Sequence, residues 1–158
     1  MKIYRIKRTQ HLPISISEAW SFFSSAENLS RITPPWMKFE VTGELPDRMY
    51  PGMIATYRLQ PVLGIKLSWM TEITHVKENE YFVDEQRHGP YRFWHHQHHF
   101  KEVENGVEMT DIVHYALPYS MFGKIAHEIT VKKKLEEIFR YRHQKVEELF
   151  QGRRSHLA

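Results

Sequence analysis

The stretch RFWHHQHHFKEVENGVEMTDIVHYAL, residues 92–117, decides how this chain folds. Residues 92–103 and 107–117 each alternate between apolar and polar side chains, which is the pattern of a β-strand with one buried face. Asn105 and Gly106 stand between the two runs, and an Asn-Gly pair between alternating segments is a strong signal for a tight hairpin turn. We therefore expect the two strands to lie side by side and antiparallel.

The turn sets which side chains face one another across this hairpin. If Glu104 pairs with Val107, the predicted pairs on one face are Phe100 with Asp111, His98 with Val113, His96 with Tyr115, and Trp94 with Leu117. This face holds more apolar bulk than the other, so we expect it to point inward. Three histidines, His95, His99 and His114, then lie on the outer face.

Polar side chains on the inward face need partners. An unpaired buried polar group costs about 1–3 kcal/mol, so we expect Asp111 to bond His98 diagonally. His96 and Tyr115 face each other in the predicted register. These four polar residues have two interpretations: a structural network whose members satisfy one another, or the polar end of an aromatic pocket. In the second interpretation Tyr57 and Trp69 are the apolar walls of the pocket. The alternative for Tyr57 and Trp69 is simple core packing.

The remaining segments predict further strands and three helical regions. Strand-like runs cover residues 2–12, 38–43, 54–60, 65–76 and 81–88. Ser17 is the predicted N-cap of a helix over residues 17–25, followed by a short turn through 28–32 that Pro34 and Pro35 end. From residue 121 to 150 apolar side chains recur at helical spacing, with Gly152 as a plausible C-cap.

A single long helix can cross a seven-stranded sheet but cannot cover it, because a helix is only about 10 Å wide. Concave space is left beside the helix, to be filled by large side chains or by a ligand. Arg142 lies in the apolar stripe of this helix, between Ile138 and Val146. It therefore requires a route to solvent, a partner such as Asp111, or an anionic ligand.

Composition excludes several classes of protein. The 158 residues are the size of one domain, which we place at residues 1–151 with a flexible tail at 152–158. The net charge of +3 is too small an excess to indicate nucleic-acid binding, and the absence of Cys excludes disulfides and thiolate metal sites. No apolar run approaches the roughly 20 residues of a membrane span, and the N-terminus does not resemble a signal peptide. We therefore expect a cytoplasmic protein.

Metal binding is considered for the outward His95, His99 and His114. Three imidazoles on one sheet face could hold zinc or nickel, but no carboxylate and no supporting partners are evident around them. We expect neither a metal nor a cofactor. Lys132, Lys133 and Lys134 predict a solvated helix face, or otherwise a contact patch for an anionic partner.

Several short motifs resemble a known superfamily. They are Ile32-Thr33-Pro34-Pro35-Trp36, Pro51-Gly52, Gly89-Pro90-Tyr91-Arg92 running into Trp94-His95-His96, Thr110-Asp111 followed by Tyr115, Leu117 and Pro118, and Phe139-Arg140-Tyr141-Arg142. With the order of elements, they resemble the START-like helix-grip superfamily, also called SRPBCC, and within it the polyketide cyclase/dehydrase-like subgroup that includes cell-division inhibitor proteins. The resemblance covers essentially the whole chain. It implies an α+β fold, with a curved seven-stranded antiparallel sheet wrapped around a long C-terminal helix and two short helices after the first strand.

The resemblance also implies a cavity for hydrophobic or amphipathic small molecules. The leading hypothesis is a binding domain that holds such a molecule between the sheet and the long helix. The candidate binding residues are Tyr57, Trp69, Trp94, His96, His98, Asp111, Tyr115 and Arg142. The alternative is a cyclase, dehydratase or isomerase, in which His98 oriented by Asp111 is the general base and Tyr115 or Arg142 stabilises an enolate. A third is an interaction module that uses the basic helix face or a sheet edge. Ligand identity and oligomeric state are not readable from the sequence.

Overall fold

The computed structural model describes residues 1–60, 65–118 and 124–151, with the backbone alone for 124–129. The elements, in chain order, are β1 (Tyr4–Leu12), α1 (Ile16–Phe23), α2 (Ala26–Leu29), the 3₁₀ turns η1 (Ser30–Ile32) and η2 (Pro35–Met37), β2 (Glu40–Val41), β3 (Ile54–Leu59), β4 (Leu67–Lys77), β5 (Tyr81–His88), β6 (Phe93–Val103), β7 (Gly106–Ala116) and α3 (Lys124–Gln151). Within these residues, no helix combines the length and the apolar composition needed to span a membrane.

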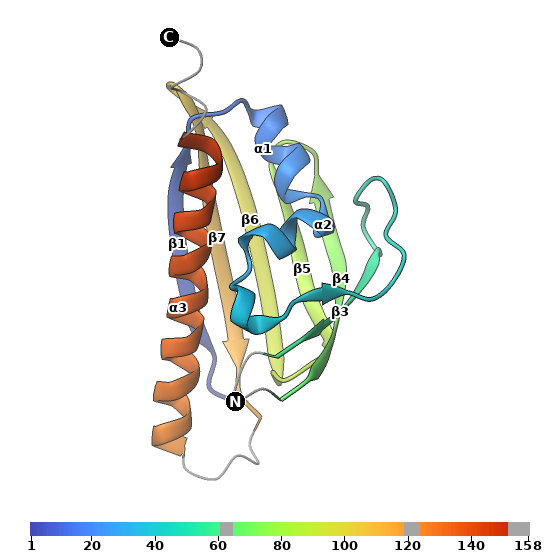
Figure 1. Cartoon of the computed structure of the whole chain (residues 1–158), viewed down its shortest axis with the longest axis vertical. Helices are drawn as coiled ribbons and strands as arrows, with labels where there is room; N and C mark the ends of the chain where they lie inside the picture. Colours follow the sequence, from blue (N-terminus) through green and yellow to red (C-terminus); the bar gives the residue numbers. More distant parts are fainter. Residues whose placement is uncertain (61–64, 119–123, 152–158) are drawn as a thin grey trace.

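The seven strands form one antiparallel sheet in the order β1-β7-β6-β5-β4-β3-β2. Each strand from β2 to β7 pairs with its neighbour in the chain, and β1 closes onto β7. Figure 1 shows α3 running beside β1 and β7, while α1 and α2 lie over β5 and β6. The predicted α+β helix-grip architecture is confirmed, since the long helix follows one side of the curved sheet and the short helices lie beside it.

The β6–β7 hairpin pairs two residues away from the predicted register. Val103 pairs with Gly106, so the turn residues are Glu104 and Asn105, and Asn105 takes a φ of 63°. The prediction that Asn105 and Gly106 form the turn is therefore wrong. Gly106 is required for another reason: a side chain there would overlap the carbonyl oxygen of Leu12 in β1.

A shift of two residues leaves every side chain on its predicted face, because side chains in a strand alternate with a period of two. The inward residues of β6, which are Trp94, His96, His98 and Phe100, are all buried. The residues between them are only half-buried. The inward face is therefore confirmed, while the predicted opposite pairs are not. His98 lies opposite Asp111, His96 opposite Val113, Trp94 opposite Tyr115 and Phe100 opposite Met109.

The N-cap of helix α1 lies two residues before the predicted one. Ser15, not Ser17, is the N-cap: its Oγ accepts from the backbone N–H of Glu18, and its own N–H donates to the Glu18 carboxylate. This reciprocal capping box satisfies two of the backbone donors that a helix start leaves unpaired. The helix then buries Ala19, Trp20 and Phe23 against the sheet.

Three other predicted elements differ at their ends. The strand expected at 38–43 is reduced to Glu40–Val41, and the long strand expected from Ile65 begins at Leu67 and contains two irregularities in its pairing with β5. The turn expected at 28–32 is formed by α2 and η1. Residues 121–123, Gly152 and the expected tail at 152–158 lie outside the described residues.

Candidate functional site

A cavity of about 890 Å³ lies between the sheet, α3 and the short helices. Its walls are mainly apolar and include Tyr57 from β3, Trp69 from β4, Trp94 from β6, and Ile138 and Phe139 from α3. The volume is within the range of about 300–1,000 Å³ that is typical of small-molecule sites. The space therefore corresponds to the part of the sheet that one helix cannot cover.

The inner face of β4 and the residues before it form one wall. Five alternating residues of this segment line the cavity: Ile65, Leu67, Trp69, Thr71 and Ile73. The Trp69 indole nitrogen donates to the Thr71 hydroxyl at 2.9 Å, and the Trp69 ring meets the Trp94 ring edge-on at 5.3 Å. The indole is thus held with its polar atom satisfied and its apolar surface turned to the cavity.

A polar cluster occupies the part of the sheet where β5, β6 and β7 lie side by side. His96 and His98 are two residues apart on β6 and so share a face. Asp84 on β5 pairs with His96, and Asp111 on β7 pairs with His98. The two imidazoles therefore lie between two carboxylates, and the side chains of all four residues are at most 16% exposed.

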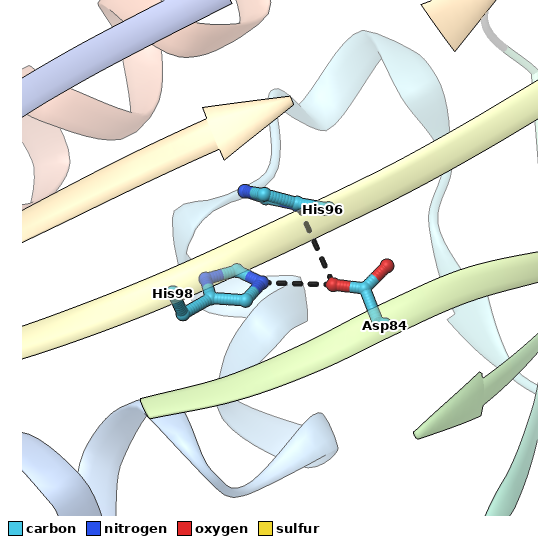
Figure 2. A group of neighbouring side chains, drawn as sticks. All are labelled: Asp84, His96 and His98. Atoms are coloured by element: carbon cyan, nitrogen blue, oxygen red, sulfur yellow. Dashed lines mark hydrogen bonds and ion pairs between the residues drawn. The ribbon is translucent and has the colours of Figure 1, made fainter. Parts of the chain in front are cut away.

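Each imidazole directs one nitrogen to each carboxylate. His98 Nε2 donates to Asp84 Oδ2 at 2.8 Å, and His96 Nε2 donates to Asp111 Oδ1 at 3.0 Å. His96 Nδ1 lies 3.4 Å from the same Asp84 oxygen. Figure 2 shows both rings meeting this one oxygen of Asp84 while its second oxygen points away from them. His98 Nδ1 is 2.9 Å from Asp111 Oδ1 but is not aligned for a hydrogen bond.

The charges in this cluster follow from its contacts. Burial alone would raise the pKa of both carboxyls, but the pKa of Asp111 is held well below its usual range by Arg142 and the two imidazoles, and that of Asp84 is lowered by His96 and His98. Burial and the neighbouring His98 lower the pKa of His96. Burial would also lower the pKa of His98, but the Asp111 and Asp84 carboxylates outweigh it and raise this pKa. The two neighbouring imidazoles are therefore shifted in opposite directions, because His98 gains more from the carboxylates than His96 does.

Arg142 brings a positive charge to the same region from α3. Its Nη2 lies 3.9 Å from Asp111 Oδ1, its guanidinium lies 5.8 Å from the centre of the Phe23 ring, and its side chain is 13% exposed. Of the three alternatives given for Arg142, the pairing with Asp111 is present as an ion pair. Arg142 also lines the cavity.

Six of the eight predicted binding residues line the cavity, and two do not. Those that line it are Tyr57, Trp69, Trp94, His96, His98 and Arg142. Asp111 lies behind the imidazoles, where it bonds His96. Tyr115 is buried among aromatic rings, stacked on Tyr4 at 5.4 Å and edge-on to Tyr91 at 5.8 Å.

Asp84 is the site residue that the sequence reasoning missed. It lies in the run Asp84-Glu85-Gln86-Arg87, which has the composition of a solvent-exposed strand. Its sequence position does contain a signal: Asp84 lies two residues after the apolar Phe82, so the two side chains share one face of the strand. Phe82 is buried, and its ring stacks on that of His98 with 4.1 Å between the ring centres. On the outer face, His95 and His114 lie 6.2 Å apart between ring centres, and His99 bonds Gln97 at 2.9 Å.

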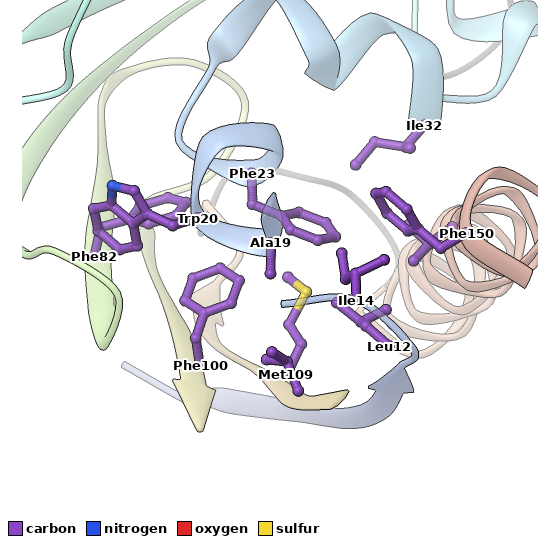
Figure 3. Close-up of a cluster of buried hydrophobic side chains, with 12 residues drawn as sticks. Leu12, Ile14, Ala19, Trp20, Phe23, Ile32, Phe82, Phe100, Met109 and Phe150 are labelled. Carbon is purple, nitrogen blue, oxygen red and sulfur yellow. The ribbon is translucent and has the colours of Figure 1, made fainter. Parts of the chain in front are cut away.

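A packed apolar cluster closes the space at one end of the molecule. Figure 3 shows Phe150 from the C-terminal end of α3 meeting Phe23 from α1 and Ile32 from η1, with Phe100 and Met109 beneath them on the sheet. All five side chains are buried. The short N-terminal helices and the end of α3 therefore pack together against the sheet at this end of the molecule.

Comparison with known proteins gives the family. Residues 12–139 match the family model described as polyketide cyclase/dehydrase and lipid transport. No curated protein matches. Protein Ms6760 from Mycobacterium smegmatis is a similar solved structure, with 17% identity, a TM-score of 0.67, and coverage of 94% of this chain and 91% of that one. Ara h 8.0201 has 12% identity and a TM-score of 0.63, with 92% of this chain and 98% of that one covered. Ginseng major latex-like protein 151 from Panax ginseng has 10% identity and a TM-score of 0.66, with 94% of this chain and 97% of that one covered. These likenesses show the fold, and the family match does not extend to the narrower cell-division inhibitor subgroup. With residues 12–139 matched, the chain belongs to the polyketide cyclase/dehydrase and lipid transport family.

Proposed function

We propose that this protein binds a hydrophobic or amphipathic small molecule in the cavity beside α3. The observation that carries the proposal is the cavity itself: about 890 Å³ of mainly apolar space, whose charged lining residues include Asp84 on the sheet and Lys134 and Arg142 on α3. Apolar surface gains about 25 cal/mol per Å² when it leaves water, so a ligand that buries about 200 Å² there would gain about 5 kcal/mol. The family description, which includes lipid transport, supports the same class of ligand.

Arg142 favours a ligand with an anionic or hydrogen-bond-accepting end. Its guanidinium offers five N–H donors, and among the described residues it makes an ion-pair contact with Asp111 at 3.9 Å but no hydrogen bond. A carboxylate, sulfonate or carbonyl group in the cavity would satisfy these donors. The apolar part of the ligand would then lie along Trp69, Trp94 and Tyr57.

The geometry supports binding over the general-base alternative. A general base needs a nitrogen within hydrogen-bond reach of the substrate. Both ring nitrogens of His98 lie within 2.9 Å of carboxylate oxygens, and Tyr115 does not reach the cavity. A reaction that used His98 would first have to separate it from Asp84.

A cavity-filling substitution tests the proposal. Ile138 lines the cavity from α3, whereas Arg140 is exposed on the same helix, so Ile138→Trp fills the space and Arg140→Trp is its matched control. Each protein is stripped of bound lipid and titrated with 8-anilinonaphthalene-1-sulfonate, which combines an apolar ring system with a sulfonate, and with dodecanoate.

We expect the wild type and Arg140→Trp to bind at one site with equal affinity, and Ile138→Trp to bind at least tenfold more weakly. Circular dichroism verifies that each variant is folded. A folded Ile138→Trp protein with wild-type affinity would place the binding elsewhere, and a wild type that binds neither probe, with no small molecule retained in native mass spectrometry, would refute the proposal.

A further inference from the structure

The inner histidines and Asp84 form a set of donors for a metal ion. One donor atom from each of Asp84, His96 and His98 lies within 4.8 Å of the donors of the other two. A metal with bonds of about 2.1 Å holds neighbouring ligand atoms about 3.0–3.4 Å apart. Asp84 Oδ2 already lies 2.8 Å from His98 Nε2 and 3.4 Å from His96 Nδ1. Both separations from Asp84 Oδ2 are therefore close to those within a metal site, and the two imidazole donors lie within 4.8 Å of each other.

The two nitrogens of His96 have different partners. His96 Nε2 is hydrogen-bonded to Asp111 Oδ1 at 3.0 Å. His96 Nδ1 lies 3.4 Å from Asp84 Oδ2, and among the described residues no hydrogen bond joins these two atoms. This nitrogen and this oxygen are therefore the pair between which a cation would lie.

Asp111 supplies the support that metal-binding histidines usually have. Such histidines donate their second nitrogen to a carboxylate or carbonyl, which fixes the ring and raises its basicity. Asp111 Oδ1 accepts from His96 at 3.0 Å, and the same oxygen lies 2.9 Å from His98 Nδ1, a buried nitrogen without a hydrogen bond. A metal bound at His98 Nε2 would displace the proton there to solvent, and the N–H of the ring would then be on Nδ1, 2.9 Å from Asp111 Oδ1.

We propose that Asp84, His96 and His98 bind a divalent transition-metal ion such as Fe²⁺, Co²⁺ or Zn²⁺ in the wall of the cavity. Two imidazoles and one carboxylate suit these ions and leave coordination positions open, here toward the cavity that the three residues line. The proposal does not depend on the ligand of the cavity.

The test uses the metal alone. The full chain is treated with EDTA, and Co²⁺ is titrated in with calorimetry and visible absorption as readouts. We expect one equivalent to bind with a ligand-field spectrum, Asp84→Asn and His98→Gln to weaken binding at least tenfold, and Asp111→Asn to weaken it by about 10- to 100-fold. The matched control is His99→Gln, a half-buried neighbour whose ring lies on the outer face of β6, which should bind as the wild type does.

Two results would overturn the proposal. One is a wild type that binds no stoichiometric Co²⁺, a measurement that needs no variant to fold. The other is binding that survives Asp84→Asn but is lost in His99→Gln, which would assign the ion to the outer histidines. Ile138→Trp should keep the metal while losing the apolar ligand, so a failure of this proposal and a failure of the binding function are distinguishable.

Discussion

Asp111→Asn removes the charge on which the buried polar cluster depends. In the wild type, Asp111 accepts from His96 at 3.0 Å and faces Arg142 at 3.9 Å. Removing one partner of a buried ion pair costs about 3–5 kcal/mol, because the other charge stays buried. Arg142 is 13% exposed and makes no hydrogen bond to Asp111, so we expect a value near the lower end, about 3 kcal/mol.

The pH dependence of this loss has a definite sign. Asp111 has a pKa lowered by folding, so its contribution to stability is present above the unfolded value of about 4 and is lost as the pH falls through the lower folded value. The difference between wild type and Asp111→Asn should therefore be largest at neutral pH and shrink progressively below pH of about 4.

Urea unfolding of the metal-free proteins from neutral to acid pH measures this difference. Asp47→Asn, at an exposed position, is the control and should change stability by no more than about 0.5 kcal/mol. The reasoning is refuted by a loss below about 1 kcal/mol at neutral pH. It is equally refuted by a loss that stays constant as the pH falls.

Three further predictions concern the fold and the cavity. Gly106→Ala places a methyl group against the Leu12 carbonyl at a residue with a φ of 152°, and should lower the free energy of unfolding in urea by more than about 2 kcal/mol. An unchanged urea midpoint would contradict this close approach. Ser15→Ala removes the cap of α1 and should cost about 1 kcal/mol, whereas Ser17→Ala should cost less. Dodecanoate at 100 times its Kd should stabilise the protein by about 2.7 kcal/mol, a rise in Tm of about 5–10 °C in a thermal melt, and no rise would argue against binding to the folded state.

The sheet could be predicted from the sequence because its signals are local and periodic. Alternation assigns the inner face of β6 and β7, and this assignment survives a register error of two residues, since such a shift returns each side chain to the same face. The register differs because the Asn105-Gly106 pair indicates a turn at those two residues, whereas Gly106 pairs with Val103. Gly106 is instead a strand residue whose missing side chain makes room for β1, a contact more than 90 positions away in the chain.

The candidate site could be predicted only in part, because alternation gives a face and not a depth. Asp111 and Tyr115 point inward as predicted. Tyr115, however, packs in a cluster with Leu135 and Phe139 of α3 and does not line the cavity. Asp84 was missed because a carboxylate among charged neighbours is typical of a solvent-exposed strand. Its burial is explained only by the imidazoles of the next strand, a relation between strands that a single segment does not contain.

The pairing of β1 with β7 has a consequence for how the protein is synthesised. Leu12 lies opposite Val107 and Tyr4 opposite Tyr115, so the first strand has no neighbour in the sheet until the ribosome has released more than 105 residues. Until then Ile6 and Leu12, both buried in the finished protein, remain uncovered, and nascent chains with such unprotected apolar surface are prone to aggregate. We therefore expect the domain to be indivisible: fragments that stop before residue 106 should be insoluble, and chaperones should hold the nascent chain until its last strand emerges.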